Sequence, residues 1–395
     1  MKYLAVLGRQ PEISIAELEA QFSTGPADFV SPKNGLCIFG GPPTKSSPVD
    51  IERFGGILKF AISLEVTPIE YLMGVPEGKI TIGVSDYSKG ATRKTAEIEA
   101  LKLKKMLVRE GRSVRVVENK DAALSTATSL HNGLSGKNER KVELIKTDDG
   151  WYRVIGVQDI DAYSRRDQAR PARDAKVGML PPKLAQILIN LCGPLPEGAT
   201  VLDPFCGTGV VLQEALLMGY RAYGTDVSER MVEYAGRNLN WLLSSRSRSR
   251  LSSQGSLEQA RRPSLCSESN QFQVAQGDAT SFTWDQPIDA VACEGYLGRP
   301  MSQIPPEIKL KAEKQECQAI ILGFLKNLAG QIRPGTPVVI AAPAWLRENG
   351  EYSRLNILDE IEDMGYNVNN KTREGLLYSR EGQIVARDII ILRKK

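Results

Sequence analysis

The amino-acid sequence predicts an α/β protein, with a doubly wound, Rossmann-like sheet domain in the C-terminal half and an α+β region before it. Strands and helices alternate regularly in the C-terminal half, whereas the N-terminal half mixes hairpins with short helices, and an arginine-rich linker at 164–180 separates them. The 395 residues suit two or three domains, and 42% hydrophobic with 25% charged residues is ordinary for folded proteins. The composition therefore excludes a disordered chain.

The α+β region is predicted to contain two units, at 1–75 and 76–163. Gly and Pro punctuate the first unit, in which Ser14 and Glu17 have the spacing of a capping box. In the second unit, apolar residues recur with the period of a helix. The elements predicted for both units are strands at 3–7, 36–39, 61–66, 79–84, 113–117, 142–145 and 152–158, and helices at 15–22, 50–60, 92–109 and 122–130.

The C-terminal domain is predicted at 181–395. Its predicted elements are helices at 182–191, 210–218, 229–243 and 309–328, and strands at 200–202, 221–225, 272–275, 290–293, 338–341, 367–370 and 384–392. A segment at 244–271, rich in Ser, Arg and Gln, interrupts this alternation and cannot bury a core. We predict a disordered insertion there, and favour inert filler over RNA binding through its arginines.

The sequence also argues against several classes of protein. It has no run of about 18 apolar residues that could span a membrane, and its N-terminal segment is better interpreted as a strand than as a signal peptide. The six cysteines form no Cys-x-x-Cys pair, and His131 is the single histidine. We therefore expect neither a zinc site nor a disulfide framework nor a histidine-based mechanism, and predict a protein of the reducing cytoplasm without a metal.

Positive charge is concentrated in particular segments, although the net charge is only +4. Residues 89–115 hold nine basic and three acidic side chains, residues 165–176 hold five and two, and residues 246–262 hold five and one. Such clusters suit a polyanionic partner, and they suit solvated surfaces equally well on charge alone.

The strongest chemical signal is Asp203-Pro-Phe205-Cys-Gly207-Thr-Gly209, which follows a predicted strand and precedes a predicted helix. Small residues there let backbone N–H groups approach a ligand at the helix N-terminus. A dinucleotide site would need a third glycine where Leu212 stands, and Asp203 would repel a pyrophosphate. A nicotinamide enzyme is therefore disfavoured.

Two more acids follow the next strands, Asp226 after 221–225 and Asp278 after 272–275. Asp226 is in position to bind ribose hydroxyls, and Asp278 to accept from an adenine amine. Asp203 suits a ligand with a cationic amino-acid moiety. Acids at three successive strand ends predict S-adenosylmethionine as the cofactor.

The 203–209 string resembles motif I of class I methyltransferases, especially the branch that methylates amino groups of nucleic acid bases. The wider chain resembles the THUMP-containing tRNA guanosine-N2 methyltransferases, within the putative RNA methylase family. Residues 1–163 resemble a ferredoxin-like unit plus a THUMP domain, particularly at 119–134, and residues 178–185 resemble the start of the catalytic domain. The resemblance implies an enzyme that uses S-adenosylmethionine to methylate guanosine N2 in tRNA, with position ten as the family's site. It leaves open an accessory protein subunit and the oligomeric state.

The chain departs from the family at the catalytic motif. The family has Asp/Asn-Pro-Pro-Tyr/Phe after the fourth strand, and this chain has Glu294-Gly295-Tyr296. We predict that Glu294 and the Gly295 carbonyl accept hydrogen bonds from the exocyclic amine, and that Tyr296 stacks on the extruded base. The longer Glu side chain could instead change the target or abolish catalysis.

RNA contacts are predicted from basic residues outside the catalytic motif: Lys89, Arg93, Lys94, Arg165, Arg166, Arg170 and Arg173. Two other hypotheses stay open at this point. The chain could be an inactive RNA-binding protein that retains the methyltransferase fold, or a methylase of another nucleic acid base.

Overall fold

The computed structural model describes residues 2–22, 29–33, 35–40, 50–174, 179–252, 271–370 and 375–395. The chain forms two compact units, Met1–Tyr163 and Ser164–Lys395, and each is described by itself. None of the helices in these ranges is both long enough and apolar enough to cross a membrane.

The first unit is built on one eight-stranded sheet with the order β2-β3-β1-β4-β8-β7-β5-β6. Its strands are β1 (Lys2–Leu7), β2 (Phe29–Lys33), β3 (Leu36–Gly40), β4 (Ile57–Ser63), β5 (Ile80–Asp86), β6 (Val114–Val116), β7 (Lys141–Thr147) and β8 (Gly150–Val157). Its helices are α1 (Pro11–Phe22), η2 (Ile51–Arg53), α2 (Pro68–Met73), α3 (Arg93–Arg109), α4 (Thr126–His131) and α5 (Ile160–Gln168), the last of which continues into the second unit.

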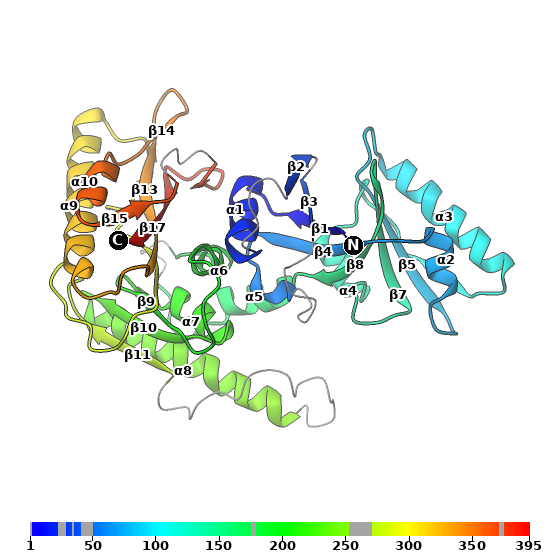
Figure 1. Ribbon diagram of the computed structural model, residues 1–395, viewed down its shortest axis with the longest axis horizontal. Coiled ribbons are helices and arrows are strands. Elements are labelled where there is room, and N and C mark those ends of the chain that lie inside the picture. The colour runs from blue at the N-terminus through cyan, green and yellow to red at the C-terminus, as the bar shows by residue number, and fades with distance from the viewer. Residues whose placement is uncertain are drawn as a thin grey trace. The chain divides into compact units, whose positions relative to one another are not determined.

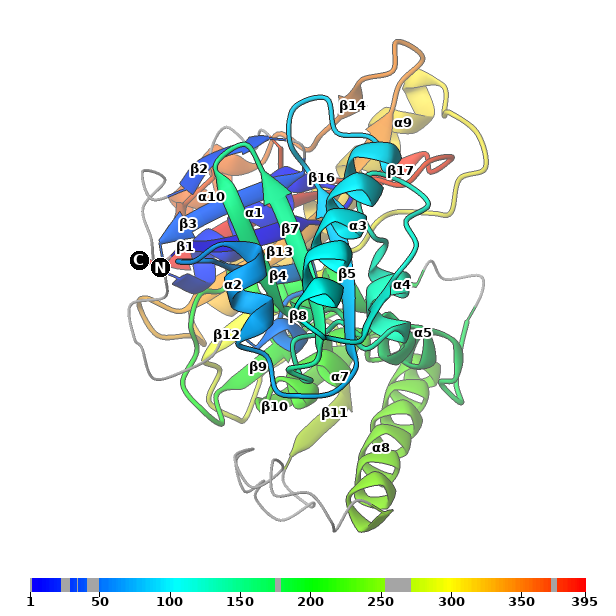
Figure 2. The same cartoon turned by 90° about the vertical axis from the view of Figure 1, so that its right-hand side faces the viewer.

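The antiparallel pairing of β4 with β8 runs across the predicted division at residue 75, so both predicted units contribute to one sheet. On the β5 side, α3 packs against the sheet and α2 packs beside α3, as Figure 2 shows. Ala100, Leu103 and Leu107 of α3 are buried there against Ile82 and other strand residues. The helix at 92–109 and its apolar face are therefore confirmed, and the separation of 1–75 from 76–163 stays a prediction.

Two predictions in the first unit are wrong. Residues 50–60 were expected to be helical, and the structure has one 3₁₀ turn followed by β4. Gly55 and Gly56 interrupt the segment, and their N–H groups donate to the buried Glu17 carboxylate at 2.9 and 2.8 Å. Ser14 and Glu17 therefore do not form a capping box. Helix α1 begins earlier, at Pro11, and the Ser14 hydroxyl donates to the Gly56 carbonyl at 2.8 Å.

The second unit is an α/β domain around a nine-stranded sheet (Figure 1). Its strands are β9 (Thr200–Asp203), β10 (Arg221–Asp226), β11 (Phe272–Gln276), β12 (Ala290–Glu294), β13 (Pro337–Leu346), β14 (Tyr352–Ser353), β15 (Tyr366–Val368), β16 (Leu377–Tyr378) and β17 (Val385–Lys394). Its remaining helices are α6 (Pro182–Leu191), α7 (Val210–Leu217), α8 (Glu229–Ser252), α9 (Glu307–Ala329) and α10 (Leu358–Asp363).

The main path of this sheet has the order β11-β10-β9-β12-β13-β17-β15. Strands β9 to β13 are parallel along this path, and β17 lies antiparallel between β13 and β15. The chain moves outward from β9 to β11 and then returns to the other side of β9 with β12. This reversal confirms the doubly wound prediction and creates a topological switch point at the carboxyl ends of β9 and β12.

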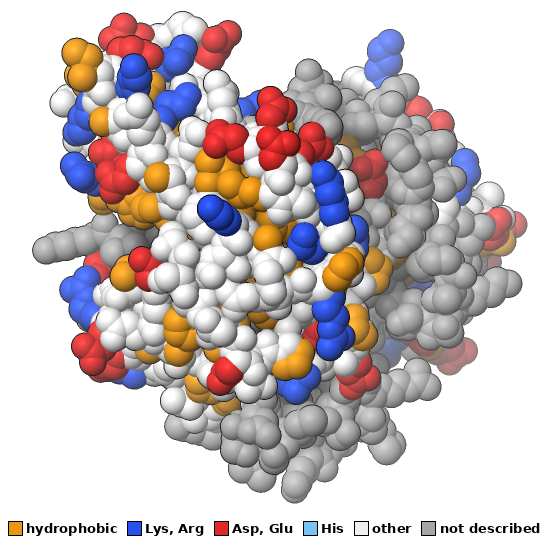
Figure 3. Space-filling view, turned by 60° about the vertical axis from the view of Figure 1, so that its left-hand side comes forward, with side chains coloured by type: hydrophobic (Ala, Val, Ile, Leu, Met, Phe, Trp, Pro, Cys, Tyr) orange, Lys and Arg blue, Asp and Glu red, His pale blue; other side chains and the backbone are white. Residues whose placement is uncertain are grey.

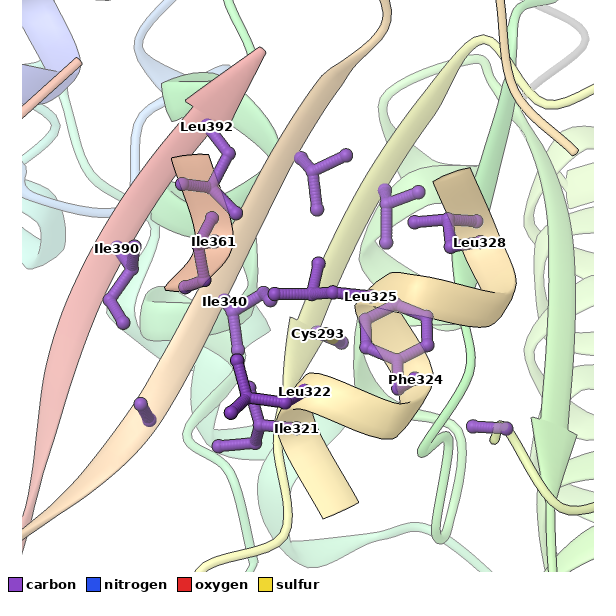
Figure 4. Close-up of a cluster of buried hydrophobic side chains, with 14 of the residues drawn as sticks. Cys293, Ile321, Leu322, Phe324, Leu325, Leu328, Ile340, Ile361, Ile390 and Leu392 are labelled. Atoms are coloured by element: carbon purple, nitrogen blue, oxygen red, sulfur yellow. The ribbon is translucent and has the colours of Figure 1, made fainter. Parts of the chain in front are cut away.

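Helix α9 supplies much of the core on one face of this sheet. Figure 4 shows Ile321, Phe324 and Leu325 of α9 facing Cys293 of β12 and Ile340 of β13. These side chains are completely buried. The helix predicted at 309–328 is therefore confirmed, and it packs on β12, whose last residue is Glu294.

Two segments predicted to be irregular are helical. Residues 164–168 of the predicted linker belong to α5, and α8 continues to Ser252 instead of ending at 243. The start of the predicted 244–271 insertion is thus a helical extension, which agrees with the tolerance of Arg for helices. Residues 253–270 of the insertion and 175–178 of the linker lie outside the described residues.

Candidate active site

The predicted site residues come together at the switch point. Asp203, Asp226 and Glu294 are the last residues of β9, β10 and β12, and Asp278 follows shortly after β11. These are the carboxyl ends of parallel strands, where doubly wound sheets bind ligands. The sheet order therefore brings to one edge acids that are far apart in the sequence.

The turn between β9 and α7 has the geometry that its glycines suggested. Gly207 and Gly209 have φ values of 49° and 81°, in the left-handed region that glycine tolerates. A Cβ atom on Gly209 would lie 3.1 Å from the Cβ of Ala235 in α8, so this position admits only glycine without displacement. A Cβ on Gly207 would meet nothing within 4 Å, so the turn is open at that point. The loop thus packs closely on α8 while leaving space beside Gly207.

Asp203 is a buried acid with few partners. It is 2% exposed, and one carboxylate oxygen accepts from the Phe205 N–H at 3.1 Å. Burial raises the pKa of Asp203 well above its ordinary range, and the charges of Asp226 and Glu294 raise it further. A cationic ligand at this edge would offset that unfavourable environment. Phe205 beside it packs edge-on against Phe324, with ring centroids 5.3 Å apart.

Asp226 and Asp278 are held by backbone amides. The two oxygens of Asp226 accept from Gly207 N–H and Ser228 N–H, each at 2.9 Å. Asp278 is exposed and accepts from the N–H and hydroxyl of Thr280, and these bonds lower its pKa. A carboxylate oxygen has two lone pairs, so Asp226 is fixed in place and can still accept from a ligand hydroxyl.

These features fit S-adenosylmethionine. The buried Asp203 suits the positive charge of the methionine moiety, the turn at Gly207 has room for a ligand, and Asp226 is oriented as a hydroxyl acceptor. Within the described ranges, no cluster of three or more His, Cys, Asp or Glu residues could hold a metal ion.

The three residues predicted to be catalytic, Glu294, Gly295 and Tyr296, lie at the end of β12. One oxygen of Glu294 accepts from Arg387 Nε at 2.8 Å, and the Gly295 N–H donates to the Ala341 carbonyl at 3.0 Å. The Tyr296 hydroxyl donates to Glu316 at 3.1 Å, and burial together with this bond raises the pKa of Tyr296 to about 12. Sequence reasoning missed Arg387 and Glu316. For Arg387 the sequence offered one weak indication: it stands beside Asp388, just before the apolar run Ile389–Leu392 of the predicted strand.

Five of the seven predicted RNA-binding residues are exposed to solvent. Lys89, Arg93 and Lys94 are exposed in the first unit, and Arg165 and Arg173 are exposed in the second. Arg93 also pairs with Glu97 at 2.7 Å. On the face that Figure 3 presents, basic and acidic side chains are interspersed, so charge alone marks no RNA-binding area there.

Arg166 and Arg170 do not fit the prediction of phosphate contacts. Arg166 pairs at 2.7 Å with Glu214, an acid of α7 whose side chain is 1% exposed. Arg170 has a side chain that is also 1% exposed, and it contacts Thr208 of the Gly207–Gly209 turn at 3.5 Å. The half-buried Arg166 thus pairs with helix α7, and the buried Arg170 supports the turn before it.

Comparison with known proteins agrees with this geometry. Residues 170–296 match the model of a family described as RMKL-like, methyltransferase domain. This match and the sheet order identify the fold of the second unit as that of a class I, S-adenosylmethionine-dependent methyltransferase domain.

Individual proteins that resemble this chain have names that state a substrate. Over 182 residues the chain is 29% identical to the tRNA (guanine(10)-N2)-dimethyltransferase of Methanothermobacter thermautotrophicus, a match that covers 46% of this chain and 44% of that protein. The protein of the same name from Pyrococcus abyssi is 48% identical over 62 residues, which are 16% of this chain and 18% of the relative. The matches thus span less than half the length of these relatives. The crystal structure of TrmN from Thermus thermophilus aligns over the whole of both chains, with 16% identity and a TM-score of 0.46.

Proposed function

We propose that this protein is an S-adenosylmethionine-dependent methyltransferase that modifies the exocyclic N2 of a guanosine in tRNA, with position ten as the first site to test. The observation that carries the proposal is the convergence of Asp203, the Gly207 turn and Glu294 at one switch point. The names of the relatives support guanosine and tRNA as the substrate class.

The residues at the end of β12 suit an amine nucleophile. An exocyclic amine reacts poorly because its lone pair is delocalised into the base. Glu294 and the Gly295 carbonyl would accept its two hydrogens and so aim the lone pair. The cofactor, when bound, supplies a methyl group on a sulfonium. After attack the proton would pass to Glu294 or to water.

Tyr296 would hold the base. Its ring packs beside the core cluster, and its hydroxyl is tied to Glu316 of α9, so the ring has a fixed orientation. Stacking of a base on an aromatic ring contributes about 1–3 kcal/mol. This would offset part of the few kcal/mol needed to extract a base from a helix.

The first unit would bind the tRNA. Lys89, Arg93 and Lys94 are exposed around the start of α3, where phosphate contacts would add affinity without sequence preference. Residues 76–163 would then act as a THUMP-like domain. The five cysteines that the structure describes across both units are unpaired, which suits the cytoplasm, where tRNA is modified. An accessory protein subunit stays open.

A tritiated-methyl transfer assay tests the proposal. Full-length protein would be incubated with unmodified tRNA transcripts, including one in which the guanosine at position ten is replaced by adenosine. Labelled N2-methylguanosine is expected from the first transcript and not from the second. Asp203→Ala and Glu294→Ala should lower the rate by about 100-fold, because positioning alone contributes that much. Glu348→Ala, an exposed acid between β13 and β14, is the matched control.

Other results would redirect the proposal. Label on another nucleoside would keep the enzyme and overturn the guanosine. If the protein bound both cofactor and tRNA and transferred no methyl group, an inactive RNA-binding protein would replace the proposed enzyme.

A further inference from the structure

Glu294 has an ion-pair partner, Arg387, that was not predicted from the sequence. Arg387 lies on β17 opposite Pro343 of β13, close to Ala341, which is itself opposite Glu294 of β12. Its guanidinium thus reaches across β13 and donates from Nε to Glu294 Oε1 at 2.8 Å. Nη1 donates to Gln383 at 3.1 Å, which fixes the other side of the guanidinium.

The surroundings of Glu294 otherwise disfavour its charge. Asp203 faces it from β9, and Cys293 precedes it on β12. Burial raises the pKa of Glu294, whereas the charge and hydrogen bond of Arg387 act in the opposite direction. Among the described residues Arg387 is the cation that pairs with Glu294. Loss of Arg387 would therefore favour the neutral carboxyl.

The state of Glu294 matters for its proposed role. A carboxylate only accepts hydrogen bonds, whereas a neutral carboxyl presents an O–H donor that would oppose an amine hydrogen. Arg387 occupies Oε1, and within the described structure no residue bonds to Oε2. The Glu294 side chain retains 16% exposure, compared with 6% for Arg387. Glu294 is thus the more exposed member of the pair.

We propose that Arg387 is the positioning residue of this site: it keeps Glu294 ionised and fixes its side chain so that Oε2 accepts from the exocyclic amine of the target base. The proposal rests on the proposed function. It also accounts for the departure from the family motif, because the ion pair restrains a side chain that is one methylene longer than Asp.

Kinetics of Arg387 variants test this role. Arg387→Gln should lower kcat by about 100-fold, with the KM for tRNA and the Kd for S-adenosylmethionine within about threefold of wild type. The acidic limb of its kcat–pH profile should move to higher pH, because Glu294 then needs a higher pH to ionise. Arg387→Lys should restore part of kcat and shift the limb less. Arg393→Gln, an exposed arginine on the same strand, should change neither.

A double variant separates positioning from simple stability. If Arg387 acts through Glu294, Glu294→Gln/Arg387→Gln should be no slower than Glu294→Gln alone. Additive losses, an unshifted pH profile, or a loss confined to cofactor affinity would overturn the proposal. Because the double variant removes both charges together, it also provides a folded reference if Arg387→Gln alone unfolds.

A second readout does not depend on the reaction. The Glu294 carboxyl can be titrated by ¹³C NMR in the full-length protein with S-adenosylmethionine bound. Its midpoint should rise in Arg387→Gln and stay unchanged in Arg393→Gln. If the wild type methylates no guanosine and the midpoint still rises, the proposed function fails and the ion-pair effect stands. If the wild type is active and the midpoint does not move, the proposal for Arg387 fails alone.

Discussion

Each unit contains a buried ion pair, and the two pairs differ in what surrounds them. Lys59 of β4 and Glu143 of β7 have side chains that are 1% and 0% exposed, and Lys59 donates to the Leu124 carbonyl, the Ser129 hydroxyl and Glu143. All three ammonium hydrogens are thereby used inside the first unit. Arg387 and Glu294 instead lie near the carboxyl end of β12, where the Glu294 side chain retains 16% exposure.

This difference distinguishes a carboxylate that holds a fold together from one that is available for chemistry. The Lys59–Glu143 pair connects β4, β7 and α4, and its acid is completely buried: Oε1 accepts from Lys59 and Ser85, and Oε2 has no partner among the described residues. The Arg387–Glu294 pair is instead partly exposed at its acid, and the charge of Glu294 acts on the nearby Asp203. We therefore expect mutations of the first pair to change stability and mutations of the second to change catalysis.

The largest effect is expected from Lys59→Met. It would leave Glu143 buried and unpaired, which should lower the free energy of unfolding by about 3–5 kcal/mol. Urea unfolding measures this loss, with the exposed Lys89→Met as control. An equal loss in both variants would show that the buried pair does not stabilise the first unit.

An intermediate effect is expected at the base-stacking position. Tyr296→Ala should weaken productive tRNA binding by about 1–3 kcal/mol, because it removes the ring. Tyr296→Phe keeps the ring, loses only the hydrogen bond to Glu316, and should cost about 1 kcal/mol. Steady-state kcat/KM for tRNA measures both, and similar losses in the two variants would argue against stacking.

The smallest effect is expected on the stability of the cofactor-free protein when the buried acid Asp203 is replaced. Since folding raises the pKa of Asp203, the folded protein binds this proton more tightly than the unfolded chain, and stability falls as pH rises above the unfolded pKa. Asp203→Asn should therefore stabilise the cofactor-free protein by about 1 kcal/mol at neutral pH and have no such effect at low pH. Thermal unfolding at pH 7 and pH 4 measures this, and S-adenosylmethionine affinity should fall in the same variant. A loss of stability at pH 7 would contradict the account.

The sequence was most informative where a local pattern determines structure. The helix at 92–109, the strands at 142–145 and 152–158, and the glycine turn at Gly207 and Gly209 were all predicted, because periodicity and turn residues are local properties. The acids at the strand ends were also predicted, because each directly follows a recognisable strand. The strand order then brings them to one edge of the sheet.

The contacts that could not be predicted from the sequence depend on the pairing of distant segments. Arg387 meets Glu294 only because β17 inserts beside β13, and Glu17 binds Gly55 and Gly56 only because α1 packs near that turn. Likewise, Arg166 and Arg170 suggested a basic linker, but Arg166 pairs with the buried Glu214, and the buried Arg170 contacts Thr208. Contacts between residues this distant in sequence have no local signature.

The most direct test of the central claim is a single-turnover reaction with deuterated-methyl S-adenosylmethionine and unmodified tRNA, read out by nucleoside mass spectrometry. We expect deuterated N2-methylguanosine from the wild type, formed about 100-fold more slowly by Glu294→Gln and at the wild-type rate by Glu348→Gln. Equal rates for wild type and Glu294→Gln, or label on a base other than guanine, would contradict it.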